Sequence, residues 1–151
     1  MFRFIGVAVF ALVTALIAAL DFTSAAAADK PVITVYKGRF CGCCSAWVEH
    51  LKENGFDARV HEVSDVTPYR EKYGVPEALA SCHTAVIGGY AIEGHVPAAD
   101  IRRLLRERPK VRGIAVPAMP SGSPGMPGTR KVPYETLLFD ASGNNVVFER
   151  H

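Results

Sequence analysis

The pattern of apolar and polar positions downstream of Lys30 predicts a chain of alternating strands and helices. Residues 32–36 form a continuous apolar run, typical of a buried strand, and residues 56–63 alternate apolar and polar side chains, typical of a half-buried strand. Between them, apolar residues recur with helical spacing over 45–54, and Gly55 follows as a natural stop. The same criteria predict a short helix at 68–73, a hairpin with strands 84–87 and 90–92, a helix at 98–108, and a second hairpin with strands 135–139 and 145–148.

This order of elements predicts an α/β fold, a thioredoxin-like single domain with a C-terminal Pro/Gly loop and β-hairpin. Residues 117–128 are dense in Pro, Gly and Ser and form the predicted loop. In the thioredoxin-like arrangement, the loop before the third strand, which usually ends in a cis-proline, packs against the first strand-to-helix turn. The corresponding residues 81–84 contain no proline, but they contain Cys82 and His83. The analogy predicts that these two residues lie beside the turn at 41–44.

The N-terminal residues 1–28 have the layout of a secretory signal peptide. Arg3 is a short basic segment, residues 5–20 are almost wholly apolar, and small residues at A-x-A spacing precede Asp29. An uncleaved anchor helix is the alternative, but this apolar core is short for a membrane span of about 20 residues. We therefore predict cleavage at the alanine run, a periplasmic location, and no membrane association of the mature domain, residues 29–151.

The length of the chain indicates the number of domains, and its charge indicates which classes of ligand it disfavours. The mature chain is long enough for one domain with one hydrophobic core. Its formal net charge of +2 is too small to indicate binding to nucleic acid. The basic residues between 102 and 112 are predicted to form the solvated face of a helix and its exit.

Three of the four cysteines lie close together in the sequence, at Cys41, Cys43 and Cys44, and the fourth is Cys82. Two structural disulfides are typical of exported proteins, but cysteines this close together do not link distant segments. A thiol-disulfide oxidoreductase would use Cys41 and Cys44 as a C-x-x-C pair, and Cys43 would then be a competing partner. In a site for a soft metal ion, by contrast, each added thiolate is a further ligand. The pattern therefore favours metal binding and leaves the oxidoreductase as the alternative.

Thiolates select soft metal ions, so Cu(I) is the predicted metal and zinc is the second choice. His83, directly after Cys82, and His95, at the end of the first hairpin, are candidate nitrogen ligands, with a surface role as the alternative for His95. Met119 and Met126 both lie in the Pro/Gly loop and are candidate thioether ligands. The alternative is that each methionine merely packs against the domain.

A set of short motifs spreads over most of the mature chain. They are Tyr36-Lys37, Cys41-Gly42-Cys43-Cys44 with Trp47, Val75-Pro76, Ser81-Cys82-His83-Thr84, Gly89-Tyr90, Glu93-Gly94-His95-Val96-Pro97, Ile114-Ala115-Val116-Pro117 with Met119-Pro120, and Gly125-Met126. Together they resemble the CopG-like copper-resistance proteins, small exported proteins described as a predicted metal-binding family. The resemblance implies a thioredoxin-like fold, a periplasmic location and a multi-copper cluster held by the four cysteines, with the candidate histidines and methionines as further ligands.

The same resemblance implies a role in copper tolerance, either by sequestering Cu(I) or by redox handling of Cu(I) and Cu(II). Other periplasmic copper-handling proteins are the expected partners, and the pattern leaves open whether the protein is a copper or thiol oxidoreductase. We expect the helix that begins near Cys43 to lower the thiol pKa values, because a helix N-terminus favours anions. We also expect thiolates to bridge more than one Cu(I) and the methionine-bearing loop to close over the site.

Overall fold

The computed structural model describes residues 29–151, and a mixed seven-stranded sheet runs through them. The predicted signal peptide, residues 1–28, lies outside the described residues. The order of the strands across the sheet is β2-β1-β3-β4-β5-β6-β7. The strands are β1 (Val32–Gly38), β2 (Asp57–Val63), β3 (His83–Ile87), β4 (Tyr90–Gly94), β5 (Gly113–Val116), β6 (Glu135–Phe139) and β7 (Asn145–Arg150).

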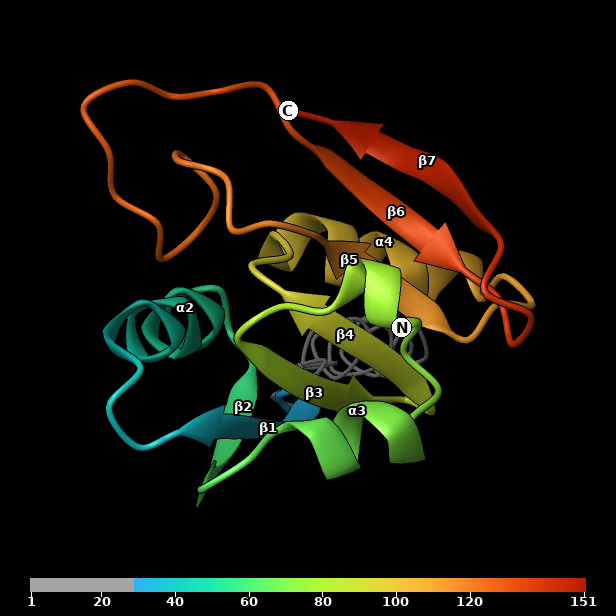
Figure 1. Ribbon diagram of the computed structural model, residues 1–151, viewed down its shortest axis with the longest axis horizontal. Coiled ribbons are helices and arrows are strands. Elements are labelled where there is room, and N and C mark those ends of the chain that lie inside the picture. The colour runs from blue at the N-terminus through green and yellow to red at the C-terminus, as the bar shows by residue number, and fades with distance from the viewer. Residues whose placement is uncertain (1–28) are drawn as a thin grey trace, which may run out of the picture.

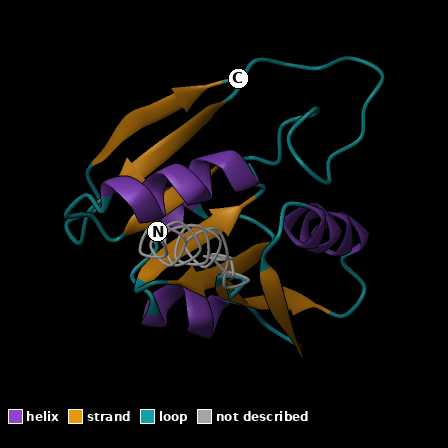
Figure 2. Ribbon diagram, turned by 180° about the vertical axis from the view of Figure 1, so that it is seen from behind, coloured by secondary structure: helices purple, strands orange, loops and turns teal. Residues whose placement is uncertain are grey.

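Helices cover both faces of this sheet. They are α2 (Gly42–Glu53), α3 (Thr67–Lys72), the short 3-10 helix η1 (Glu77–Leu79) and α4 (Ala98–Glu107). Figure 1 shows α3 in front of the sheet, and Figure 2, seen from behind, shows α4 on the opposite face. The larger core cluster lies under α2 and α4 and includes Trp47, Leu51, Ile101 and Leu104, packed on apolar side chains of β1, β3, β4 and β5.

The pairing of the strands confirms most of the predicted order. β1 and β2 are parallel, with α2 as the connection, and β3 runs antiparallel to β1. The two predicted hairpins are present as β3–β4 and β6–β7. No helix or strand lies between Val116 and Glu135 in this described part of the chain, so the Pro/Gly segment is a loop as predicted. Within residues 29–151, no helix is both long and apolar enough to span a membrane.

Three elements differ from the sequence prediction, and one of them is the short 3-10 helix η1, where no helix was predicted. The first helix begins at Gly42 instead of residue 45, because Cys41 has extended backbone angles and starts the helix as its N-cap. Residues 113–116 form β5, which pairs parallel with β4 and antiparallel with β6, and no strand was predicted there. All four residues of β5 are buried, so this strand has no alternation of apolar and polar positions by which it could be distinguished from the adjoining loop.

The antiparallel pairing of β1 and β3 positions the candidate site. Lys37, near the end of β1, lies opposite His83, the first residue of β3. The chain leaves β1 into the turn that carries the first three cysteines, and it enters β3 directly after Cys82. Consequently the register of these two neighbouring strands places Cys82 and the cysteine turn at the same end of the sheet.

Candidate metal centre

The turn between β1 and α2 carries three of the four cysteines. Cys41 is the N-cap residue of α2, and Cys43 and Cys44 lie in its first turn. Among the described residues no side chain caps this helix end, so free backbone N–H groups and partial positive charge face the turn. Cys41 and Cys44 form a disulfide with their Cα atoms 5.3 Å apart, whereas Cys43 and Cys82 are free thiols. The C-x-x-C pair is therefore present in its oxidised form.

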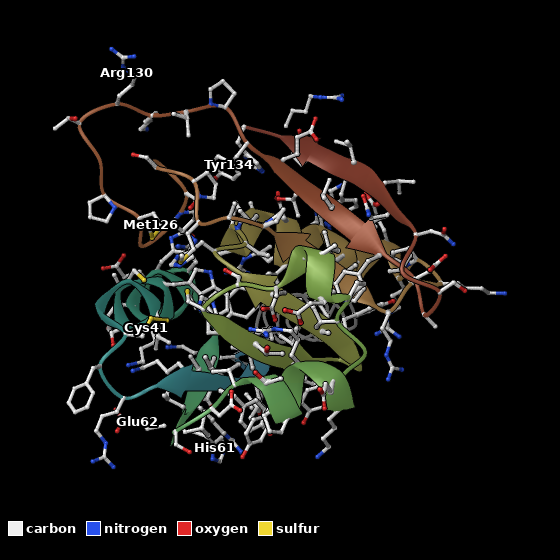
Figure 3. All side chains as sticks on the ribbon, viewed as in Figure 1. Cys41, His61, Glu62, Met126, Arg130 and Tyr134 are labelled. Atoms are coloured by element: carbon white, nitrogen blue, oxygen red, sulfur yellow. A yellow bond between two sulfur atoms is a disulfide. The ribbon has the colours of Figure 1, made fainter. Side chains whose placement is uncertain are left out.

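The fold brings Cys82 to this turn, although it lies 38 residues after Cys44. The carbonyl oxygen of Cys82 is 3.7 Å from the Sγ of Cys44. The Sγ atoms of Cys41 and Cys43 are 3.5 Å apart, and the four sulfur atoms all lie within 4.8 Å of one another. Figure 3 shows the sulfur atoms gathered around the N-terminal end of α2, beside the label of Cys41. The predicted placement of Cys82 beside the other three cysteines is confirmed.

A second group of ligand atoms joins Cys82 to two histidines. The Sγ of Cys82 lies 3.5 Å from Nδ1 of His83 and 3.3 Å from Nε2 of His95. One ligand atom from each of these residues lies within 4.8 Å of the others. His83 begins β3 and His95 follows β4, so the hairpin brings the two rings together with their centroids 5.0 Å apart. Cys82 belongs to both groups, one made of four sulfurs and one made of a sulfur and two nitrogens.

His83 is a buried ring with an unpaired nitrogen. The residue is 0% exposed, and its ring packs 4.3 Å from the ring of Trp47. Among the described residues, Nε2 of His83 is buried and has no hydrogen-bond partner. Leaving such a group unsatisfied costs about 1–3 kcal/mol, so a core position alone does not account for a histidine here. The other ring nitrogen, Nδ1, is the one that lies 3.5 Å from the Sγ of Cys82. A thiol with two imidazole rings is a donor set that suits a soft metal ion, so the residues present fit such an ion.

A hydrogen bond to the Pro/Gly loop fixes the ring of His95. The Nδ1–H group of His95 donates to the carbonyl oxygen of Pro124 at 2.7 Å, which assigns the proton to this nitrogen. Its Nε2 then carries a free lone pair and points at the Sγ of Cys82. Ligating histidines are commonly oriented in this way, by a carbonyl that accepts from the nitrogen away from the metal.

Burial dominates the acid–base properties of this centre. Burial, and to a smaller extent the neighbouring His95, lowers the pKa of His83 to about 3, so this imidazole is neutral at physiological pH. Burial also lowers the pKa of His95, opposed by its bond to Pro124. Burial and the nearby Cys43 raise the pKa of Cys82 to about 11. The expectation of lowered thiol pKa values is therefore wrong for Cys82, which lies outside the helix whose N-terminus would favour a thiolate.

The Pro/Gly loop packs on the start of α2. A side chain at Gly125 would meet the backbone nitrogen of Trp47 at 2.6 Å and the carbonyl oxygen of Cys43 at 2.7 Å, so only glycine allows this close approach. Met126 follows directly and lines a surface hollow with side chains from the outer side of α2, as its label beside that helix in Figure 3 indicates. Met119 is 40% exposed. The assignment of either methionine as a ligand remains a prediction.

Sequence reasoning assigned no individual role to three charged residues within the fold: Lys37, Arg70 and Glu93. Glu93 is 0% exposed, and Arg70 donates to it from Nε at 3.3 Å. Burial raises the pKa of Glu93, and its hydrogen bonds oppose the shift. Lys37 is 4% exposed and donates from Nζ to the carbonyl oxygen of Gly38 at 3.1 Å. Lys37 and Glu93 each follow apolar residues within a strand, and this break in the apolar pattern is the signal that could have identified them.

Comparisons with known proteins find similarity in both sequence and fold. Residues 79–126, which include Cys82, both candidate histidines and the docked part of the loop, match a family described as "Protein of unknown function, DUF411". No curated protein matches the sequence. Among solved structures, two forms of copper resistance protein CopG are similar, Form 2 with a TM-score of 0.76 and Form 1 with a TM-score of 0.75. Each is 44% identical to this chain, and each match covers 81% of this chain and 98% of the other.

Proposed function

This chain belongs to the family of copper resistance protein CopG, and from that premise we propose that it binds Cu(I) as its cargo and so contributes to copper tolerance. The observation that carries the proposal is the sharing of Cys82 between a four-sulfur group and a Cys–His–His group. Soft thiolates favour Cu(I), and imidazole nitrogens suit the same metal. Zinc accepts a similar set of ligands and is the second choice.

We propose that the site holds more than one copper ion. A thiolate has spare lone pairs, so Cys82 can bridge an ion held by the sulfur group and an ion held by His83 and His95. The short separations among the four sulfur atoms support such sharing, because every ligand atom lies within 4.8 Å of the others in its group. Met119 and Met126 are proposed as additional thioether ligands from the loop.

The redox state of one cysteine pair determines how many sulfurs can bind. In the disulfide form, Cys41 and Cys44 have no thiolate to offer, and Cys43, Cys82 and the two histidines remain. Two electrons and two protons convert the disulfide into two thiols, and binding of Cu(I) then displaces the thiol protons. The form with full capacity is therefore the reduced one.

We place the mature protein in the periplasm, after removal of the signal peptide, and we assign it a thioredoxin-like fold. The parallel pair of β1 and β2, the intervening α2 and the β3–β4 hairpin support that fold assignment. Other periplasmic copper-handling proteins are the proposed partners for the delivery or removal of copper. The loop that packs on α2 at Gly125 is proposed to shield bound Cu(I) from solvent.

A thiol-disulfide oxidoreductase remains the second candidate function. The observation that favours it is the Cys41–Cys44 disulfide, at the N-terminus of a helix where such pairs react. The free Cys43 between the two partners argues against it, because this thiol could attack the same disulfide.

The direct test is to load the purified protein with Cu(I) before and after reduction of the disulfide. Copper and zinc are measured by elemental analysis, and free thiols are counted in the same samples. We expect the reduced protein to bind more copper than the oxidised protein and to retain it against a chromogenic Cu(I) chelator. A reduced protein that loses all its copper to a weak chelator would contradict the proposal.

The variant Cys43→Ser separates the two candidate functions. If Cys43 is a ligand, this change lowers the copper content but does not reduce any activity towards the disulfides of insulin. An oxidoreductase that uses only Cys41 and Cys44 would instead show unchanged copper content and equal or higher insulin reduction. That second result would decide in favour of the enzyme.

A further inference from the structure

We propose that Arg70 and Glu93 form a positioning clamp that holds Cys82, His83 and His95 in the geometry required for metal binding. This inference rests on the proposed function, binding of Cu(I) at the Cys/His centre. Arg70 comes from α3 and Glu93 from β4, so the clamp joins the helix on one face of the sheet to the hairpin that carries the histidines.

Glu93 holds both ends of the segment that carries Cys82 and His83. One carboxylate oxygen accepts the backbone N–H of Ser81 at 2.6 Å, and the other accepts the hydroxyl of Thr84 at 2.6 Å. The two ligand residues lie between these anchor points in the sequence. A single buried carboxylate therefore fixes the backbone before Cys82 and the side chain after His83.

Arg70 completes the clamp from the other side. Its Nε donates to the carboxylate of Glu93 at 3.3 Å, and its Nη2 donates to the carbonyl oxygen of Ser81 at 2.7 Å. Both backbone polar groups of Ser81 are thus used, one by each member of the pair. With these bonds in place, Ser81, the residue before Cys82, is held at both its N–H and its carbonyl group.

The clamp also connects this segment to His95. Glu93 lies two residues before His95, and the intervening Gly94 has a φ of +71°. A side chain at Gly94 would meet Oγ of Ser81 at 2.7 Å, so the two ligand-bearing segments are in direct contact at this glycine. The separation of 3.3 Å between Cys82 Sγ and His95 Nε2 is set within this tightly packed unit.

Stability alone is a poor explanation for this pair. The Glu93 side chain is 0% exposed and that of Arg70 is 12% exposed, and a buried ion pair often stabilises a protein no more than apolar residues of the same volume. What the pair adds is a defined geometry for its bonded neighbours. Hydrogen-bonded partners behind the ligands commonly change metal affinity by about 10–100-fold.

A second buried carboxylate supplies a matched control. Asp100, 4% exposed, also accepts from a threonine hydroxyl, that of Thr136 at 2.5 Å, and it contacts Nε2 of His151 at 2.9 Å. Its partners lie on β6 and at the C-terminus. Glu93→Gln and Asp100→Asn each remove one buried charge and keep the shape of the side chain, so they differ mainly in which segment they release.

The first measurement is competition for Cu(I) against a chromogenic chelator with the reduced protein. We expect Glu93→Gln to weaken binding by about 10–100-fold and Asp100→Asn to leave it unchanged. Thr84→Val retains the charges and removes one donor, and it should show a smaller loss in the same direction. Thr84→Val and Arg70→Lys keep the test decisive if Glu93→Gln does not fold.

The second measurement needs no metal. In a Cys43→Ser background with the disulfide intact, Cys82 is the remaining free thiol among the described residues, and its alkylation rate reports how firmly its segment is held. Glu93→Gln should speed alkylation, and Asp100→Asn should not. If Glu93→Gln matches Asp100→Asn in both measurements while the wild type binds Cu(I), the clamp is wrong and the proposed function stands. A wild type that binds no Cu(I) overturns the proposed function itself.

Discussion

The two halves of the metal centre are built in different ways. Apart from Cys82, which both halves share, the sulfur half comes from one short turn, Cys41 to Cys44, whose neighbour Phe40 is 95% exposed. The histidine half comes from the two ends of a hairpin, and both its rings are fully buried. One half can form a disulfide within itself, whereas the other is held by hydrogen bonds from α3, β4 and the Pro/Gly loop.

This difference indicates that the two halves have different roles in metal binding. Ligands from a local turn need little of the fold, and their number changes with the redox state of one pair of cysteines. Ligands on buried strands keep their positions because the core and the polar groups around them leave few alternatives. We infer that the histidine half supplies ligands in a fixed geometry. The sulfur half supplies a number of thiolate ligands that changes with the redox state of Cys41 and Cys44.

Cys82→Ala breaks both halves at once and should have the largest effect. Cys82 belongs to both ligand groups, so its loss should lower the affinity for Cu(I) by more than the roughly 100-fold that changes behind the ligands can produce. Competition against a chelator measures this. Cys43→Ala, which removes a ligand from the sulfur group alone, is the matched comparison and should lose less. A Cu(I) titration of Cys82→Ala that matches the wild type would mean that this cysteine binds no metal.

The same division explains what the sequence could predict. The turn at residues 41–44 was identified because its cysteines are neighbours in the chain, and topology by analogy placed Cys82 beside them. The clamp was not identified, because Arg70 and Glu93 are 23 residues apart and come from different elements, α3 and β4. Strand β5 was missed because all of its residues are buried, which leaves no periodicity to read.

Long-range contacts also explain the remaining differences. The unpaired Nε2 of His83 is a property of the assembled core and has no counterpart in the sequence. The raised pKa of Cys82 arises from burial, which a helix-based argument about neighbouring cysteines does not include. Residue type and spacing were therefore enough to choose the candidate ligands, whereas burial and hydrogen bonding around them required the fold.

His83→Phe sharpens the comparison within the histidine half. Phenylalanine keeps a ring against Trp47 and removes the unpaired nitrogen. The metal-free protein should be as stable as the wild type or more stable, by up to about 1–3 kcal/mol, while the affinity for Cu(I) falls by roughly tenfold. Thermal melts with and without Cu(I) measure both effects. Strong destabilisation of the metal-free form with unchanged affinity would make His83 a core residue only.

The stability of the metal-free protein should also depend on pH through His83. Its pKa is about 3 in the folded protein against an ordinary value of 6.5, so between these values the unfolded chain binds a proton that the native state excludes. The free energy of unfolding is therefore unaffected by His83 protonation above pH 6.5. It decreases as the pH falls from 6.5 towards 3, by at most about 1.4 kcal/mol per pH unit. Denaturant melts of the wild type and His83→Phe should diverge in this range, and parallel curves would contradict the assignment.

The smallest effect is expected from the loop that lies over the sulfur half. Met119→Leu combined with Met126→Leu keeps volume and apolar character, so the metal-free protein should melt like the wild type. A thioether has no proton to lose, so its contribution to copper binding should persist in acid, where thiolates weaken. We therefore expect a few-fold faster transfer of Cu(I) to a chelator, with the largest relative loss of affinity at low pH.

Competition for Cu(I) at neutral and acidic pH measures this loss, alongside a thermal melt of the metal-free double variant. The exposure of Met119 and the position of Met126 beside α2 make a large change in stability unexpected. If the double variant binds Cu(I) as the wild type does at both pH values, the loop acts only through Pro124 and Gly125, its contacts with His95 and α2. A large loss of stability without copper would instead identify the methionines as packing residues, because a change confined to metal ligands leaves the metal-free fold intact.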